Sequence, residues 1–370
     1  APARTPILAV MDLGICVASD ITDIDYVVEA ERLGYTRAWF ADSQMLWSDP
    51  YACLALAATR TSTIGLGTGV AVAATRPAPV TAASIATINA LAPGRTFLGI
   101  GTGNTAMRIM GHPPMRIAEF DEYLRALGPL LRGDESEVTF RGKTSPVRHV
   151  MPDAGFVDFA HEIAVHVSAF GERSLEVAGR HGDGVILPLP PTPAFLDRFW
   201  VSIEEGAGSV GRVIDRAEYY VSCLTTIVVL DEDERADSER AKYEAGAFAM
   251  AAVHYAYDQW RNFGRPPTVP AIVDIWDDYT ALVEQTPADR LHQRIHRGHN
   301  CWVEPDEEQF LTDDLMRQTT LTGTANEIVE RLEGLAEHGL DHVMVLPSLA
   351  PRVEVLRRVA RGVMPHLARG

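Results

Sequence analysis

The chain has 370 residues, of which 46% are hydrophobic and 22% are charged, an ordinary composition for a folded protein with a large core. Its formal net charge is −17, from 33 Lys and Arg against 50 Asp and Glu. This excess of negative charge repels nucleic-acid backbones and anionic membrane surfaces, so we expect neither as a partner. No apolar run reaches the length of a membrane span.

The four cysteines, Cys16, Cys53, Cys223 and Cys301, are far apart in the sequence and form no CxxC pair. We therefore expect reduced thiols in a cytoplasmic protein, rather than a disulfide framework or a structural zinc site. The first ten residues contain one Arg and no long apolar core, so they do not have the pattern of a signal peptide.

In the first half of the chain, short apolar segments alternate with segments of helical periodicity. This alternation indicates βαβ units around a parallel sheet. The predicted strands are 7–15, 36–40, 64–70 and 96–100, and the predicted helices are 24–33, 50–59, 79–91 and 116–131.

The second half continues the alternation after a predicted hairpin over residues 137–150. Strands are predicted at 163–167, 184–187, 219–229 and 342–346, and helices at 172–180, 194–205, 231–257, 325–337 and from Pro351 onward; residues 188–193 are a proline-rich loop. About eight strand–helix units favour a single-domain (β/α)8 TIM barrel over residues 1–370, because an open Rossmann sheet usually has fewer.

An interruption of this pattern at residues 265–320 is interpreted as an insertion that covers the site. Its central part, 271–314, is irregular and rich in Trp, His and acidic residues. We expect this segment to be a lid, with Trp276 and Trp302 in the substrate pocket.

Barrel enzymes carry their chemistry in the loops that follow the strands. These loops are predicted to begin near eight positions: Cys16, Ala41, Gly69, Gly101, Ser168, Pro188, Leu230 and Pro347.

Two of these loops have the residues for holding a cofactor. Gly101, Thr102, Gly103 and Asn104 follow a strand, and their glycines let backbone amides approach a ligand. A tight turn packed under the barrel mouth is the less favoured alternative. Ala169-Phe-Gly-Glu-Arg-Ser174 opens a helix. Its free amides, with Arg173 and Ser174, could bind a phosphate, or Ser174 and Glu172 could only cap the helix.

The end of the second predicted strand carries Asp42 and Ser43, before an aromatic loop with Trp47 and Tyr51. Asp42 could act as an acid or base, accept a hydrogen bond in the pocket, cap a helix or form a salt bridge. Cys16, at the mouth of the first strand, is expected to be a buried, inert thiol that borders the substrate pocket with Trp47.

No metal site is expected. His292, His296 and His299 lack an HExxH pattern, so a solvated or packing role is favoured for them. The chain also has no G-x-S-x-G elbow and no Walker loop, which argues against hydrolases and phosphoryl transferases.

Several segments together resemble the luciferase-like superfamily, which includes bacterial luciferase and methylenetetrahydromethanopterin reductase. The segments are 76–87 (RPAPVTAASIAT), Leu91, Gly94-Arg95, 97–103 (FLGIGTG), 176–184 (EVAGRHGDG) and 322–328 (TGTANEI). The resemblance spans the chain and is weakest between residues 232 and 320.

The resemblance implies a flavin or the deazaflavin coenzyme F420 at the strand ends. It implies a cis peptide between Gly69 and Val70, with Val70 behind the cofactor ring, residues 101–104 near the ring or its tail, and the phosphate at the 169–174 turn, where Gly171 takes part. Many relatives have a His directly after the acid at the second strand, whereas this chain has Ser43, so a histidine role cannot be transferred to that position.

The resemblance, together with Ser43 in place of the histidine, implies a two-component monooxygenase that uses reduced FMN and O2 on a small organic substrate, with a separate flavin reductase as a possible partner. Asp42 and Ser43 would be its catalytic residues. The alternatives are an F420-dependent hydride-transferring oxidoreductase and, from another class, a barrel that binds flavin without catalysis. We expect a homodimer or larger homo-oligomer.

Overall fold

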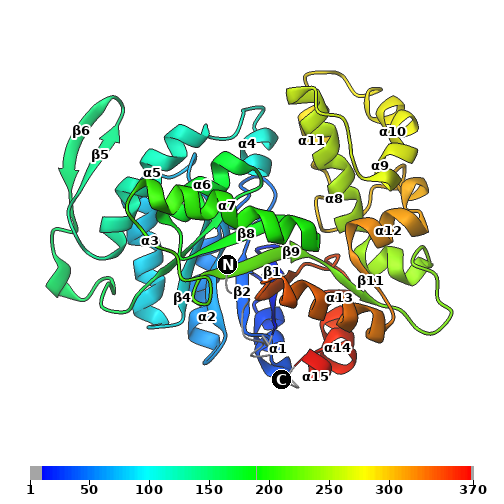
Figure 1. The fold of residues 1–370 in the computed structure, drawn as a ribbon, viewed down its shortest axis with the longest axis horizontal. Helices are drawn as coiled ribbons and strands as arrows, with labels where there is room; N and C mark the ends of the chain where they lie inside the picture. Colours follow the sequence, from blue (N-terminus) through cyan, green and yellow to red (C-terminus); the bar gives the residue numbers. More distant parts are fainter. Residues whose placement is uncertain (1–10, 189, 368–370) are drawn as a thin grey trace.

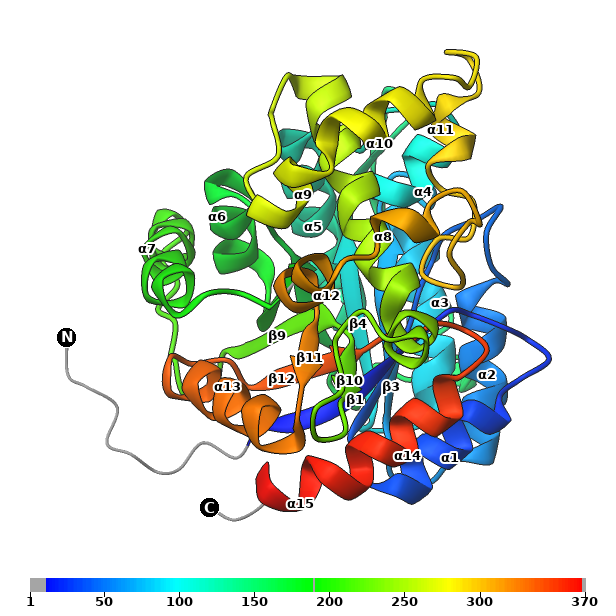
Figure 2. The same ribbon diagram turned by 90° about the vertical axis from the view of Figure 1, so that its right-hand side faces the viewer.

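The computed structural model describes residues 11–188 and 190–367, and they form a closed barrel of eight parallel strands (Figures 1 and 2). The barrel closes where Leu13 lies opposite Val343. The predicted (β/α)8 architecture is therefore confirmed. In spatial order, the strands are β1 (Asp12–Val17), β12 (His342–Val345), β9 (Tyr220–Thr225), β8 (Gly184–Pro188), β7 (Ala164–Ser168), β4 (Thr96–Gly101), β3 (Gly65–Val72) and β2 (Arg37–Phe40).

Helices surround the barrel, and local signals in the sequence set their ends. Helix α2 begins where the Asp49 carboxylate accepts hydrogen bonds from the amides of Tyr51 and Ala52, and α1 ends at Gly34, whose φ of 93° favours glycine. The surrounding helices are α1 (Asp25–Leu33), α2 (Pro50–Arg60), α3 (Ala78–Leu91), α5 (Ile117–Leu131), α6 (Glu172–His181), α7 (Pro193–Ser209), α13 (Ala325–Glu337), α14 (Arg352–Gly362) and α15 (Met364–Leu367). None of the helices in the described residues is long and apolar enough to cross a membrane.

The floor of the barrel is filled by large aromatic and polar side chains. Trp39 is fully buried, and its Nε1 donates to His342 Nε2 at 3.0 Å. Its ring also packs against Phe97, at 4.3 Å between centroids. These residues fill the interior toward the amino-terminal ends of the strands, and the cavity described below lies toward the carboxyl ends.

Two predictions for the segment after β9 were wrong. The predicted strand 219–229 divides into β9 and β10 (Ile227–Val229), and β10 leaves the barrel to pair with β11 (Leu321–Gly323). The loop after this barrel strand therefore starts at Thr225, not near Leu230. The next helix, α8 (Glu239–Phe263), begins later than expected because the Ser238 hydroxyl caps it at the Ala241 amide.

Segment 265–320 is more ordered than its composition suggests. It contains the short helices α9 (Pro270–Asp274), α10 (Trp276–Val283), α11 (Leu291–Arg294), η2 (Glu308–Phe310) and α12 (Asp313–Thr319). They pack with α8 around a second hydrophobic core, and in Figure 1 they gather with α8 on one side of the barrel. On the opposite side, β5 (Ser136–Phe140) and β6 (Lys143–Val147) form the predicted hairpin, which projects from the molecule. Helix α4 (Asn104–Ile109) and η1 (Pro152–Ala154) were not predicted.

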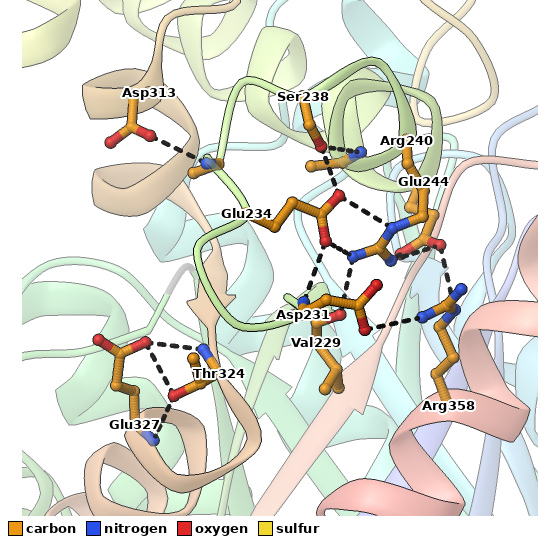
Figure 3. A network of polar contacts seen from close by, with 12 residues as sticks. Val229, Asp231, Glu234, Ser238, Arg240, Glu244, Asp313, Thr324, Glu327 and Arg358 are labelled. Atoms are coloured by element: carbon orange, nitrogen blue, oxygen red, sulfur yellow. Dashed lines mark hydrogen bonds and ion pairs between the residues drawn. The ribbon is translucent and has the colours of Figure 1, made fainter.

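A polar network attaches α8 to the rest of the barrel (Figure 3). Arg240 pairs with Glu234, binds Glu244 at 2.9 and 3.0 Å, and donates to the Val229 carbonyl at 3.1 Å. Glu244 also lies 3.7 Å from Arg358 of α14. These contacts fix the start of α8, the helix that borders the cavity described next.

Candidate active site

A cavity of about 440 Å³ opens at the carboxyl ends of the barrel strands, where the barrel fold predicts a site. Most of its wall is apolar. The wall contains residues from the strand ends and from α8: Cys16, Ala41, Asp42, Ser43, Trp47, Gly69, Val70, Val72, residues 101–106, Pro114, Ile117, Ser168, Phe170, Ser174, Ile186, Leu187, Leu224, Phe248, Ala251, Ala252, Tyr255, Gln259, Phe263, His299, Asn300, Met344 and Leu346.

The peptide bond between Gly69 and Val70 is cis, as the family resemblance predicts, and both residues line the cavity. Beside them, a Cβ added at Gly101 would lie 3.1 Å from Val70 Cγ2 and 3.2 Å from Ser168 Cβ. The end of β4 therefore lies directly against the irregular part of β3 between Thr68 and Ala71, and a larger residue at 101 would crowd this wall.

Residues 101–104 all line the cavity. Gly103 has a φ of 82°, and a Cβ there would lie 2.4 Å from Val72 Cγ1, so both its conformation and its packing require glycine. Asn104 begins α4, and its side-chain oxygen accepts a 3.0 Å hydrogen bond from Arg108 Nε. Residues 101–104 therefore form the tight turn that was one interpretation of this segment, and they also line the cavity.

The 169–174 turn lies at the edge of the cavity. Ser174 and Phe170 are on the wall, and the Ser174 hydroxyl accepts from the amides of Phe170 and Gly171 at 3.0 Å each. Ala169 is buried behind the turn, whereas Gly171, Glu172 and Arg173 are exposed. Among the described residues, Arg173 has no hydrogen bond or ion pair, and a Cβ at Gly171 would meet nothing within 4 Å.

Asp42 is nearly fully buried, and one of its oxygens binds the Arg76 guanidinium and the Val72 amide, the latter at 3.2 Å. Arg76 also binds Asp49 at 3.0 Å. Burial raises the pKa of Asp42 above its ordinary value, while Arg76 opposes the rise. The salt bridge considered for Asp42 is therefore present, and the neighbouring Ser43 is buried on the same wall.

The four residues predicted for the substrate pocket have different positions. Cys16 and Trp47 line the cavity, and burial raises the pKa of the Cys16 thiol to about 12, so this thiol is unreactive. The prediction for Trp276 was wrong, because its ring packs in an aromatic cluster with Tyr257 and Trp260. Trp302 was also misplaced: it is half exposed and lines a second cavity instead.

Several cavity residues were not predicted, and they come from α8 and from the segment after α11. Neither segment carries a motif, and only the fold brings them over the strand ends. The residues are Phe248, Tyr255, Gln259, His299 and Asn300. Within the described part of the chain, no three His, Cys, Asp or Glu residues are grouped so that they could hold a metal ion.

The family model for luciferase-like monooxygenases matches residues 22–342, most of the chain. The chain belongs to the luciferase-like family. As a member of this superfamily of flavin and F420 enzymes, it is an oxidoreductase.

Named relatives of this luciferase-like protein include enzymes that use the deazaflavin. It is 33% identical to an F420-dependent glucose-6-phosphate dehydrogenase of Intrasporangium calvum over 93% of this chain and 94% of that one. It is 25% identical to a 5,10-methylenetetrahydromethanopterin reductase of Archaeoglobus fulgidus over 96% and 100% of the two chains.

Two solved structures share the fold of this luciferase-like protein. The coenzyme F420-dependent tetrahydromethanopterin reductase of Methanopyrus kandleri matches with a TM-score of 0.68 and 20% identity, over 96% of this chain and 99% of that one. The oxygenating constituent of 3,6-diketocamphane monooxygenase of Pseudomonas putida, in complex with FMN, matches with a TM-score of 0.62 and 16% identity, over 96% and 98%. The same barrel thus accommodates either cofactor.

Proposed function

We propose that this protein is an F420-dependent oxidoreductase that transfers a hydride to or from a small organic substrate. The observation that carries this proposal is the 33% identity, over nearly the whole of both chains, with an F420-dependent dehydrogenase. The FMN-dependent monooxygenase favoured by the sequence patterns becomes the second candidate.

The residues at the barrel mouth fit a deazaflavin or flavin. The ring would lie in the apolar cavity against Val70 and residues 101–104. The phosphate of its side chain would lie at the start of α6, where the amides of Glu172 and Arg173, the first two of the helix, have no acceptor within it. The exposed guanidinium of Arg173 is available there, and the open space around Gly171 leaves the approach clear.

When bound, the deazaflavin supplies a carbon centre that gives or accepts a hydride. The protein contributes the environment for this transfer. Its apolar wall excludes water, and Asp42, held by Arg76, fixes the end of β3 through the hydrogen bond to the Val72 amide. Ser43 follows Asp42 and lines the same cavity, and we assign to its hydroxyl the orientation of the substrate by hydrogen bonding.

The second candidate is a two-component monooxygenase that receives reduced FMN from a separate reductase. The match to the family model of luciferase-like monooxygenases favours it. Asp42 and Ser43 would then orient the substrate or the flavin oxygen within the same apolar cavity.

Cofactor binding measured side by side distinguishes the two candidates. We expect the purified protein to bind F420 in the micromolar range or tighter, measured by quenching of protein fluorescence, and to bind FMN at least tenfold more weakly. If FMN binds more tightly, and if the protein loaded with reduced FMN forms a transient peroxyflavin absorbance on stopped-flow mixing with O2, the monooxygenase replaces the proposed function.

A further inference from the structure

Hydride transfer to or from oxygen-bearing carbon also requires a proton transfer, and few side chains on the cavity wall can perform it. The titratable ones in the described wall are Cys16, Asp42, Tyr255 and His299. Asp42 is bound to Arg76, and burial raises the pKa of both the Cys16 thiol and the Tyr255 phenol. Ser43, at the position where many relatives have a histidine, does not titrate in the useful range. His299 is the remaining titratable group, and a neutral imidazole can accept a proton from a substrate hydroxyl.

His299 lies in the segment after α11, and its position suits proton exchange. Neither ring nitrogen has a hydrogen-bond partner among the described residues. Nδ1 is fully buried, whereas Nε2 is not. Its ring lies 5.9 Å from the Trp47 ring and 5.5 Å from the His296 ring, measured between centroids. An imidazole nitrogen without an internal partner is available to a ligand.

His299 and Trp47 also separate the main cavity from the second one, because both residues line both cavities. The second cavity has a volume of about 450 Å³ and contains polar groups as well as apolar ones. It gives His299 a route for proton exchange that does not pass through the substrate. Its other lining residues are Ala18, Ser19, Asp20, Leu46, Ser48, Gly298, Cys301, Trp302 and Leu349.

The charged and titratable groups behind His299 keep it neutral. His296 of the same segment and His254 of α8 face it, and beyond them Asp258 lies 3.5 Å from His296 Nε2. Arg108 of α4 lies 3.7 Å from Asp258. Burial, together with His296 and His254, holds the pKa of His299 well below its ordinary value, so this imidazole is an unprotonated base at neutral pH.

The charge of the wall restricts the substrate. No Lys or Arg is among the described residues that line the main cavity, and its one carboxylate, Asp42, is compensated by Arg76. An anionic group such as a sugar phosphate would therefore be buried without a cation, at a high cost in free energy. An uncharged alcohol or ketone avoids this cost.

We infer that His299 is the catalytic base of this cavity, and that the substrate is an uncharged, largely apolar alcohol that is oxidised to a carbonyl compound. This inference rests on the proposed function. The substrate O–H bond breaks and its proton forms an N–H bond at His299 Nε2. The C–H bond breaks with its electron pair, which passes as hydride to oxidised F420, and the C=O bond forms. The imidazolium then releases its proton to solvent through the second cavity. The reverse sequence reduces a ketone.

His299→Gln tests this role, with His338→Gln as the matched control, because His338 pairs with Asp197 at the protein surface. We expect His299→Gln to lower kcat for a panel of secondary alcohols about 10²–10⁴-fold, the usual contribution of a general base. It should leave the affinity for F420 within about twofold, and the fall of kcat/KM at acid pH that we expect for the wild type should disappear. The control variant should retain wild-type kcat and the acid limb.

Two further measurements do not depend on the activity of the loaded enzyme or on one variant. The ¹⁵N-imidazole NMR signals of the cofactor-free protein should include one histidine that is neutral down to acid pH, absent in His299→Gln, and that shifts when a secondary alcohol binds. In His299→Ala, added imidazole should restore turnover in proportion to its neutral form, which a purely structural role would not permit.

The failure of this inference is distinguishable from the failure of the proposed function. If the wild type binds F420 and oxidises alcohols but His299→Gln retains both kcat and the acid limb, His299 is not the base. Preferred turnover of a sugar phosphate over every uncharged alcohol would overturn the substrate class. If the wild type does not bind F420, the proposed function fails, and this inference fails with it.

Discussion

The buried pair of Asp42 and Arg76 allows a quantitative test of how the cavity wall is stabilised. The Asp42 side chain is 3% exposed and that of Arg76 is 21% exposed. Arg76→Met keeps an unbranched apolar stem but removes the guanidinium, which lies over the Tyr51 ring, and leaves the carboxylate without its cation. Breaking a buried pair in this way typically costs about 3–5 kcal/mol. We expect the lower end, about 3 kcal/mol, because Asp42 keeps the Val72 amide and Arg76 is not fully enclosed.

The destabilisation caused by Arg76→Met should depend on pH. Burial raises the pKa of Asp42 above its ordinary value of 3.8, while Arg76 opposes the rise, so folding favours the protonated form of this carboxyl group. The cost in folding free energy of burying the ionised Asp42 carboxylate is fully present above the folded-state pKa and vanishes as the pH falls toward 3.8. Removing Arg76 raises the folded-state pKa further. The destabilisation by Arg76→Met should therefore be larger at pH 8 than at pH 5.

Urea denaturation of four proteins measures the effect: the wild type, Arg76→Met, Asp42→Asn and the double variant. In the Asp42→Asn background the loss from Arg76→Met should shrink to about 1 kcal/mol or less, because no buried charge is left unpaired. Arg60→Met, which removes a pair with the exposed Asp25, is the surface control and should cost less than about 1 kcal/mol. A loss from Arg76→Met that is equal at both pH values and unchanged by Asp42→Asn would refute the reasoning.

Three further predictions concern other parts of the molecule. Arg173→Ala should weaken F420 binding by about 1–3 kcal/mol in calorimetry without changing the thermal midpoint of the cofactor-free protein, and an unchanged affinity would remove Arg173 from the site. Arg240→Ala should destabilise the fold by about 3 kcal/mol in urea denaturation, because it leaves the Glu244 carboxylate, which is 4% exposed, without its cation. Adding Glu244→Gln should recover part of the loss, and strict additivity of the two changes would contradict this reasoning. Burial alone would raise the pKa of Glu307, but the neighbouring His254 and Arg294 outweigh this effect and hold the pKa below 4.5. Glu307 therefore stabilises the fold fully above pH 4.5, and this stabilisation is lost as the pH falls through the lowered pKa. Glu307→Gln should flatten acid unfolding monitored by Trp fluorescence, whereas an unchanged slope would argue against the role of this cluster.

The barrel could be predicted because its signals are local. Helix α13 begins with the capping box of Thr324 and Glu327, and its predicted and observed bounds agree. Strands buried on both faces read as short apolar runs between such helices. The split between β9 and β10 could not be predicted, because residues 219–229 remain apolar across the point where the chain leaves the barrel. The pairing of β10 with β11 instead depends on a segment about a hundred residues later.

Some residues of the candidate site could likewise be predicted from the sequence, and others could not. The positions on the strand ends, such as Asp42 and residues 101–104, follow from the fold rule that loops after barrel strands form the site. The role of Trp276 was mispredicted because an aromatic residue in an insertion can fill a core as readily as a pocket, and here it fills the second hydrophobic core. His299 was set aside because a histidine without a motif gives no sign of its neighbours, which lie on α4, α8 and the loop after β2.

The cavity wall has two parts, one from the barrel strands and α6 and one from α8 and the segment after α11. Under the proposed function, the strand ends and the start of α6 would hold the cofactor, and their positions are fixed by the closure of the barrel. Tyr255 and His299 come instead from α8 and the segment after α11, which are held to the barrel by the Arg240 network and by packing in a second core. Substitutions there can change the substrate without disturbing the barrel. Differences in substrate between relatives should therefore concentrate in α8 and residues 291–300, where the wall has no cation and the imidazole is neutral.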